Sequence, residues 1–300
     1  MEQLHQSSRL ENIYQKYYKI ALIIPIALIL ASIVYLTLFT AKNGDIIYKD
    51  VSLTGGTTIT VFDTQIKIED LKSSLISEFP DLNVRSITDI TTGEQKAFYI
   101  ESKESVDKLK PALEKEIGYA LTEENSSVEF SGQSLSEGFY KQLRLAVIIA
   151  FVLMAIVVFI IFRTPVPSGA VIFSAFADII LTIAVIDLIG FRLSTAGIIA
   201  LLMLIGYSVD TDILLTTRLL KSSENLPVNK KIFGAFKTGM TMTLAAIVAI
   251  GAALLIVNGL SDVLSQMFII ILIGLGFDII NTWITNASIL KWYMEVKKIQ

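Results

Sequence analysis

Long apolar runs dominate this 300-residue chain and leave one extended polar segment near its N-terminal end. A helix needs about 20 consecutive apolar residues to cross a bilayer core about 30 Å thick. Runs of this kind occur at 20–39, 145–162, 168–189, 194–216, 232–257 and 264–290. The first run is longer than the core of a signal peptide, and no A-x-A cleavage pattern follows it. The pattern therefore predicts six membrane-spanning helices.

The polar segment at 41–144 has its own periodicity. Apolar residues recur at helical spacing over 68–79 and 106–117. β-branched and apolar residues favour short strands at 57–62, 83–90, 97–101 and 127–131. The order βαββαβ is typical of a ferredoxin-like fold. We therefore expect an α-helical polytopic membrane protein that carries one α+β domain outside the membrane, between the first and second spans.

The distribution of Lys and Arg predicts the orientation, because short cytoplasmic loops are enriched in these residues. With the N-terminus inside, the two short outer loops contain only Arg192. The inner segments then hold Arg9, Lys16, Lys19, Arg163, Arg218, Lys221, Lys230, Lys231, Lys237, Lys291, Lys297 and Lys298. This predicts cytoplasmic segments at 1–19 and 291–300, a five-helix bundle over 145–290 and an extracytoplasmic domain at 41–144.

Composition narrows the possible chemistry. Charged residues make up 18% of the chain, and the net charge of −3 offers no basic excess for nucleic acid. The chain has no Cys, which excludes disulfides, thiol catalysis and thiolate metal sites. Its one His is His5, in the polar N-terminal segment. We therefore expect no catalytic residues, no metal, no cofactor and no enzyme activity.

Carboxyl groups within the predicted spans are the most informative residues. Asp178 and Asp278 fall near the middle of the third and sixth spans, and Asp210 and Asp212 fall in the inner half of the fourth. A central Asp costs about 2.5–3.5 kcal/mol on insertion scales, so each should face the bundle interior or water. These residues are candidates for proton or ion coupling. Structural hydrogen bonding between helices is the alternative.

Asp210 is the strongest of these candidates on local sequence. Gly206, Tyr207 and Ser208 precede it, offering a close helix approach and hydroxyl partners for a carboxyl. Arg218 follows at the cytoplasmic end of the span, where it either sets the field around Asp210 or anchors the helix at the interface. We expect Asp210 to respond to protons, with Asp178 or Asp278 as relay partners.

An enzyme of the intramembrane aspartyl protease type is the competing interpretation. That class places one catalytic Asp in a Gly-x-Gly-Asp motif. Here Gly274-Leu275-Gly276-Phe277-Asp278 has one residue too many, which rotates Asp278 about 100° around its helix. The spacing argues against a protease.

Several motifs resemble those of the SecD/SecF family of protein-export membrane proteins, in the RND superfamily. Gly55-Gly56-Thr57 follows the first span, Gly206-Tyr207-Ser208-Val209 lies in the fourth, and Asp178 lies in the third. The chain looks like the SecF branch in an archaeal-like form. Ser52 and Leu53 depart from the family's Asp-Phe before the glycines, and Asp210-Thr211-Asp212 departs from the bacterial Asn-Asp-Thr.

The resemblance implies a function, partners and a location. It implies a heterodimer with SecD in the cell membrane, surrounded by lipid and beside the SecYE channel. The outer domain would engage unfolded preproteins, powered by the proton gradient. An RND-type exporter half for lipids or small molecules, or a scaffold subunit without an energy source, are the alternatives. The sequence leaves the choice between H⁺ and Na⁺ open.

Overall fold

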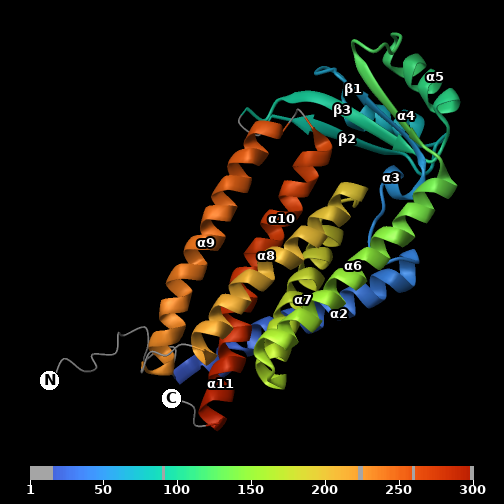
Figure 1. Cartoon of the computed structure of the whole chain (residues 1–300). Coiled ribbons are helices and arrows are strands. Elements are labelled where there is room, and N and C mark those ends of the chain that lie inside the picture. The colour runs from blue at the N-terminus through green and yellow to red at the C-terminus, as the bar shows by residue number, and fades with distance from the viewer. Residues whose placement is uncertain (1–15, 90–91, 222–225, 259–260, 298–300) are drawn as a thin grey trace.

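The computed structural model describes residues 16–89, 92–221, 226–258 and 261–297, and His5 lies outside these ranges. Within them, six helices are long and apolar enough to cross a membrane. The first five spans are formed by α2 (Ile23–Asn43), α6 (Gln133–Phe162), α7 (Pro165–Leu188), α8 (Thr195–Leu220) and α9 (Val228–Val257). The sixth begins with α10 (Asp262–Ile280) and continues through the π-helical turn η1 (Asn281–Asn286) into α11 (Ala287–Lys297). The helices pack into one bundle (Figure 1).

Helices α7 and α8 form the centre of the bundle. In their most apolar stretches 67% and 56% of the residues are buried, against 11% in α6 and 6% in α9. Pro165 begins α7 at a position that needs no backbone donor, and the Ser194 side chain accepts the Gly197 N–H at the start of α8. Most residues of α7 and of the buried face of α8 are therefore shielded from lipid by other helices.

The domain between α2 and α6 has the predicted βαββαβ order. It consists of a short helix α3 (Val51–Thr54), β1 (Gly56–Val61), α4 (Ile68–Leu75), β2 (Asn83–Thr88), β3 (Gln95–Ser102), α5 (Val106–Ile117) and β4 (Ser126–Ser131). The strands form an antiparallel sheet in the order β2-β3-β1-β4. Ile59, Phe98 and Ile100 of the sheet are fully buried with Leu109 and Leu113 of α5. The predicted fold class is confirmed.

The largest difference from the predicted boundaries is at the second span. The second span was expected to begin at residue 145, but α6 begins at Gln133. Its first turns contain Lys141 and Arg144, which the apolar pattern excluded from a membrane segment. The helix therefore extends out of the apolar layer and carries the outer domain on its end (Figure 1).

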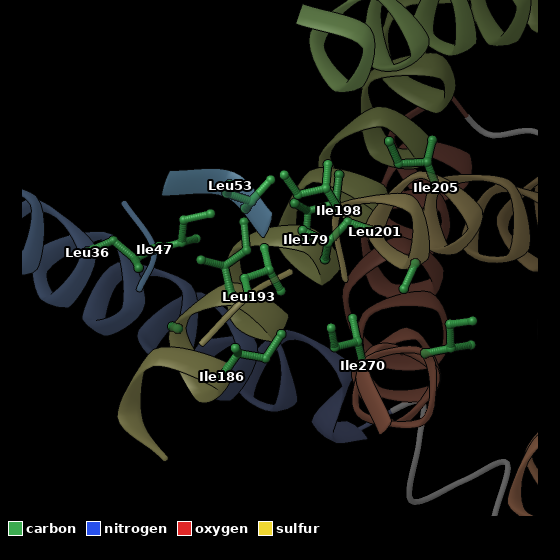
Figure 2. Packing of buried hydrophobic residues seen from close by; sticks show 14 of the residues in the cluster. Leu36, Ile47, Leu53, Ile179, Ile186, Leu193, Ile198, Leu201, Ile205 and Ile270 are labelled. Carbon is green, nitrogen blue, oxygen red and sulfur yellow. The ribbon is translucent and has the colours of Figure 1, made fainter. Parts of the chain in front are cut away.

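The βαββαβ domain is joined to the bundle through the loop between α7 and α8. The Leu193 N–H donates to the Tyr48 carbonyl at 2.6 Å, and the Asp50 N–H donates to the Leu193 carbonyl at 3.1 Å. Ile47 and Leu53 pack with Leu36 and Leu193 in the same apolar cluster (Figure 2). Backbone pairing and apolar burial thus hold the domain against the helices.

Asp50 makes this junction sensitive to pH. Its carboxylate accepts hydrogen bonds from the Ser52 N–H and hydroxyl, at 2.9 and 2.6 Å, and the same hydroxyl accepts the Thr195 N–H. Burial raises the pKa of Asp50 to about 7, although the hydrogen bonds from Ser52 favour its charged form. The folded state therefore holds a proton that the unfolded chain has released, so the contribution of Asp50 to stability decreases as pH rises from about 4 to 7.

The Gly-Gly-Thr motif has a packing explanation. Gly55 adopts φ +80° and ψ 155°, a conformation that is almost restricted to glycine. A Cβ there would lie 2.3 Å from Cα of Gln133, at the start of α6. A Cβ on Gly56 would lie 2.3 Å from the Ser102 carbonyl oxygen. The buried Thr57 hydroxyl donates a hydrogen bond to the Glu104 carbonyl. The motif lets β1 pass directly beside α6 and β3.

We predict that Gly55→Ala destabilises the protein by more than about 2 kcal/mol, because it combines backbone strain with a clash against α6. Gly138→Ala is the matched control, because Gly138 lies in α6 with open space around it. The control should be neutral or stabilising by up to about 1 kcal/mol. Thermal melting of the purified variants measures both, and equal melting temperatures would contradict the packing role of Gly55.

Candidate ion-coupling site

A polar stripe runs down the buried face of α8. Ser208, Thr211, Asp212 and Thr216 are all nearly inaccessible. They follow one another at intervals of three, one and four residues, which places them on one side of a helix. Apolar residues such as Leu204 and Leu215 continue the same face. The stripe therefore points to the helices that cover α8, not to lipid.

A second polar stripe lies on the last spanning helix. Asp278, Asn281, Thr282, Thr285 and Asn286 share one face, and each is 0% exposed. All but Asp278 lie in the π-helical turn η1. A π-helical turn inside an α-helix is often found at functional sites, because it redirects side chains that a regular helix would point elsewhere. Here it adds amide and hydroxyl groups to the face occupied by Asp278.

Asp178 of α7 joins the two stripes. Its carboxylate accepts a hydrogen bond from the Ser208 hydroxyl on α8 and another, at 2.6 Å, from the Asn281 side-chain amide. The side chain is 0% exposed. One carboxyl group thus connects three helical segments that are far apart in the sequence.

Asp278 and Asp212 have separate donors within the same region. The Thr211 and Thr282 hydroxyls each lie 3.1 Å from Oδ1 of Asp278. Oδ1 of Asp212 accepts the Asn286 amide at 2.7 Å. Its other oxygen, Oδ2, is buried without a hydrogen-bond partner, as is the side-chain oxygen of Asn286. The carboxyl of Asp212 therefore has one oxygen that nothing in the described chain satisfies.

The cluster contains carboxyls but no cation. None of the five ion pairs recorded among the described residues involves Asp178, Asp212 or Asp278. A buried carboxylate without a neutralising partner is costly. No three acidic side chains in the described ranges converge closely enough to hold a metal ion. Among the described residues, these three carboxyls therefore have no neutralising side chain in the recorded ion pairs.

Asp210 lies outside this cluster. Its side chain is exposed on α8, as is that of Tyr207, and Gly206 lies on the same exposed face. Of the two surroundings expected for Asp210, the bundle interior or water, the structure therefore contradicts the first. Arg218 is also exposed, and its guanidinium lies 3.4 Å from the Thr238 hydroxyl of α9. Of the residues singled out from sequence, the structure brings together Asp178, Ser208, Asp212 and Asp278.

Four residues of the site were not predicted from the sequence: Thr211, Asn281, Thr282 and Asn286. Their signal was present in the spacing. Asp278, Asn281, Thr282 and Asn286 repeat at three, one and four residues, as Ser208, Thr211, Asp212 and Thr216 do. Asp210 is two residues from both Ser208 and Asp212, which rotates it about 200° away from that face. Helical phase, more than the identity of flanking residues, separates the two carboxyls.

Comparison with known proteins assigns the class. A family model described as protein export membrane protein SecD/SecF, C-terminal, matches residues 113–296. The chain belongs to this family of protein-export membrane proteins.

The relatives narrow the assignment to the SecF branch. The protein-export membrane protein SecF of Methanocaldococcus jannaschii is 40% identical over 95% of this chain and 99% of its own length. That of Methanothermobacter thermautotrophicus is 38% identical over 94% of each chain. Both relatives are archaeal SecF proteins and are matched along nearly their full length. This agrees with the archaeal-like form expected from the motifs.

The fold is shared with solved structures of SecDF. The SecDF crystal structure from Thermus thermophilus matches with a TM-score of 0.74 and 18% identity, over 93% of this chain. A super-membrane-facing form of SecDF matches with a TM-score of 0.59 and 20% identity. This chain spans only 38% and 39% of those two chains.

Proposed function

We propose that this chain acts in protein export together with SecD, beside the SecYE channel, on unfolded preproteins. The match to 38% of the SecDF chain supports this, because the remainder of that chain is the counterpart that SecD would provide. The SecDF of Thermus thermophilus is described as translocon-associated. The role is that of a transport subunit without an enzymatic step of its own.

The exposed face of α8 supports a partner helix at that position. Gly206, Tyr207 and Asp210 lie on it at the depth of the membrane, with Met203 41% exposed beside them. An Asp facing lipid near the membrane centre costs about 2.5–3.5 kcal/mol on insertion scales. A helix of SecD that covers this face would remove that cost and supply donors for the carboxyl. Gly206 would let the two helices approach closely.

Coupling to the proton gradient is the second part of the proposal. The observation that carries it is the set of three buried carboxyls, Asp178, Asp212 and Asp278, with no cation among them. The unsatisfied oxygen of Asp212 makes this residue the foremost proton carrier, ahead of Asp210. Moving one charge through 100 mV releases about 2.3 kcal/mol, which is enough to bias a conformational change.

We predict that Asp212→Asn assembles with SecD but exports no faster with a proton gradient than without one. Asn keeps the size of the side chain but cannot carry a proton. The measurement is preprotein uptake into vesicles that contain this chain, SecD and SecYE, with and without an imposed gradient. Asp70→Asn, on an exposed face of α4, is the control and should respond like the wild type.

Asp210→Asn separates coupling from assembly. It should reduce the amount of SecD that copurifies, while each assembled complex keeps its response to the gradient.

A full gradient response in Asp212→Asn would contradict the coupling role of the cluster. If export responded to a sodium gradient and not to a proton gradient, the coupling ion would be Na⁺ in place of H⁺. Copurification of a lipid cargo in place of SecD would favour an exporter, and export without any gradient response would favour a scaffold.

We also propose that both termini are cytoplasmic and that the βαββαβ domain is extracytoplasmic. The near absence of Lys and Arg from the two short loops on the domain side supports this orientation. The side of the membrane on which the domain lies decides whether it meets a preprotein before or after passage. The proposed pulling role requires the outer side.

Single-cysteine labelling tests this orientation, since the chain has no Cys of its own. Glu94→Cys, on an exposed turn of the domain, should react with a membrane-impermeant maleimide in intact cells. Lys297→Cys, exposed at the end of α11, should react only after the membrane is opened. The reverse pattern would overturn the orientation.

A further inference from the structure

A cleft of about 230 Å³ lies where α2 and α6 leave the membrane on the domain side. The connector after α2 forms one wall, and the first turns of α6 form the other. The apolar part of α2 ends near Phe39, and that of α6 begins at Leu145. The cleft therefore lies at the level expected for lipid headgroups, and Leu53 and Thr54 of α3 also line it. Figure 1 shows α3 beside the first turns of α6, below the sheet.

The inner wall of the cleft is neutral and ordered. Lys49 forms an ion pair with Asp45 at 3.0 Å, and the Tyr140 hydroxyl donates to the same carboxylate at 2.8 Å. Burial opposes the charged form of Asp45, but hydrogen bonds from Tyr140 and Lys49 hold its pKa below the usual range. Asp45 therefore stays ionised and offsets the charge of Lys49.

The outer wall carries a net positive charge. Lys141 and Arg144 are exposed, lie one helical turn apart on α6 and line the cleft. The Arg144 guanidinium lies 5.8 Å from the centre of the Tyr140 ring, which holds it beside the opening. Neither residue takes part in the ion pairs recorded among the described residues. Glu137 is the one acidic residue on this wall, and two cations outweigh it.

The surface on the membrane side of the cleft is apolar. Leu145 and Ile148 of α6 are each 55% exposed, and Leu38 of α2 is 67% exposed. A cationic cleft above such a surface matches a ligand with an anionic head and apolar chains. Basic pockets between spanning helices bind anionic lipid headgroups on the cytoplasmic side of membranes, and the same electrostatic attraction applies to an anionic headgroup on the domain side. A free phosphate ion could bind the cations, but it has no apolar part to contact the apolar surface below the cleft.

We propose that this cleft binds an anionic membrane lipid, with Lys141 and Arg144 contacting its phosphate and its acyl chains lying along α6 beyond Leu145. The lipid would fill the gap between the connector and α6, directly beneath α3 and the start of the outer domain. It would thereby brace the domain against the membrane surface. The site uses neither the carboxyl cluster nor the exposed face of α8, so it stands independently of the proposed export role.

Native mass spectrometry of the full chain, released from an uncharged detergent, tests the site. The probes are phosphatidylglycerol and phosphatidylcholine with identical acyl chains. Wild-type protein should retain phosphatidylglycerol selectively, and Lys141→Gln with Arg144→Gln should lower that retention about tenfold. Lys103→Gln with Lys115→Gln removes the same charge from exposed positions on the outer domain and should change nothing. Circular dichroism checks that each variant is folded. If the variant with both Lys141→Gln and Arg144→Gln is unfolded, the single variant Arg144→Gln takes its place.

Each other result has a defined meaning. Equal retention of the two lipids by the wild type, or an equal loss in the control pair, would overturn the proposal, because the attraction would then be unspecific. Displacement of the lipid by millimolar inorganic phosphate would show that the cleft binds a phosphate ion only. Displacement by added SecD would show that the cleft belongs to a protein interface. Either displacement would overturn a lipid site.

Discussion

Three carboxyl groups buried without a cation are the constraint on which the rest of the bundle depends. Asp178, Asp212 and Asp278 lie on α7, α8 and α10, and each needs donors that its own helix does not provide. Ser208, Asn281, Thr211 and Asn286 supply them across helix boundaries. Individual hydrogen bonds between membrane helices are modest, about 0.6 kcal/mol on average. Their effect is to fix how far each helix is rotated, since a turn of any one would leave a charged or polar group facing hydrocarbon.

The same helices hold the outer domain. Leu193, in the loop between α7 and α8, exchanges backbone hydrogen bonds with the segment that leads into the domain. The Thr195 N–H, in the first turn of α8, donates to Ser52. Asp178 and Asp212 lie further along these two helices. In the proposed energy coupling, a change in the protonation of the cluster and a movement of the domain would thus act on the same pair of helices.

The sequence was sufficient for the fold because each of its signals was local. Runs of about 20 apolar residues give the spans, and the alternation of strand and helix periods gives βαββαβ. It was insufficient at Asp210, where neighbouring residues suggested a buried site but helical phase placed the side chain on the opposite face. It also missed Asn281 and Asn286, because an amide in a span is unremarkable until its partner is known. The extension of α6 to Gln133 was hidden because its first turns are polar.

A double-mutant cycle on the free energy of unfolding tests the central claim most directly. Asp178→Asn and Asp278→Asn, alone and together, should be non-additive by at least about 1 kcal/mol, because both carboxyls share the network formed by Ser208, Thr211 and Asn281. Asp210→Asn combined with Asp278→Asn should be additive within about 0.5 kcal/mol, since Asp210 faces the other way. Additivity between Asp178 and Asp278, or strong coupling to Asp210, would contradict a single buried carboxyl cluster.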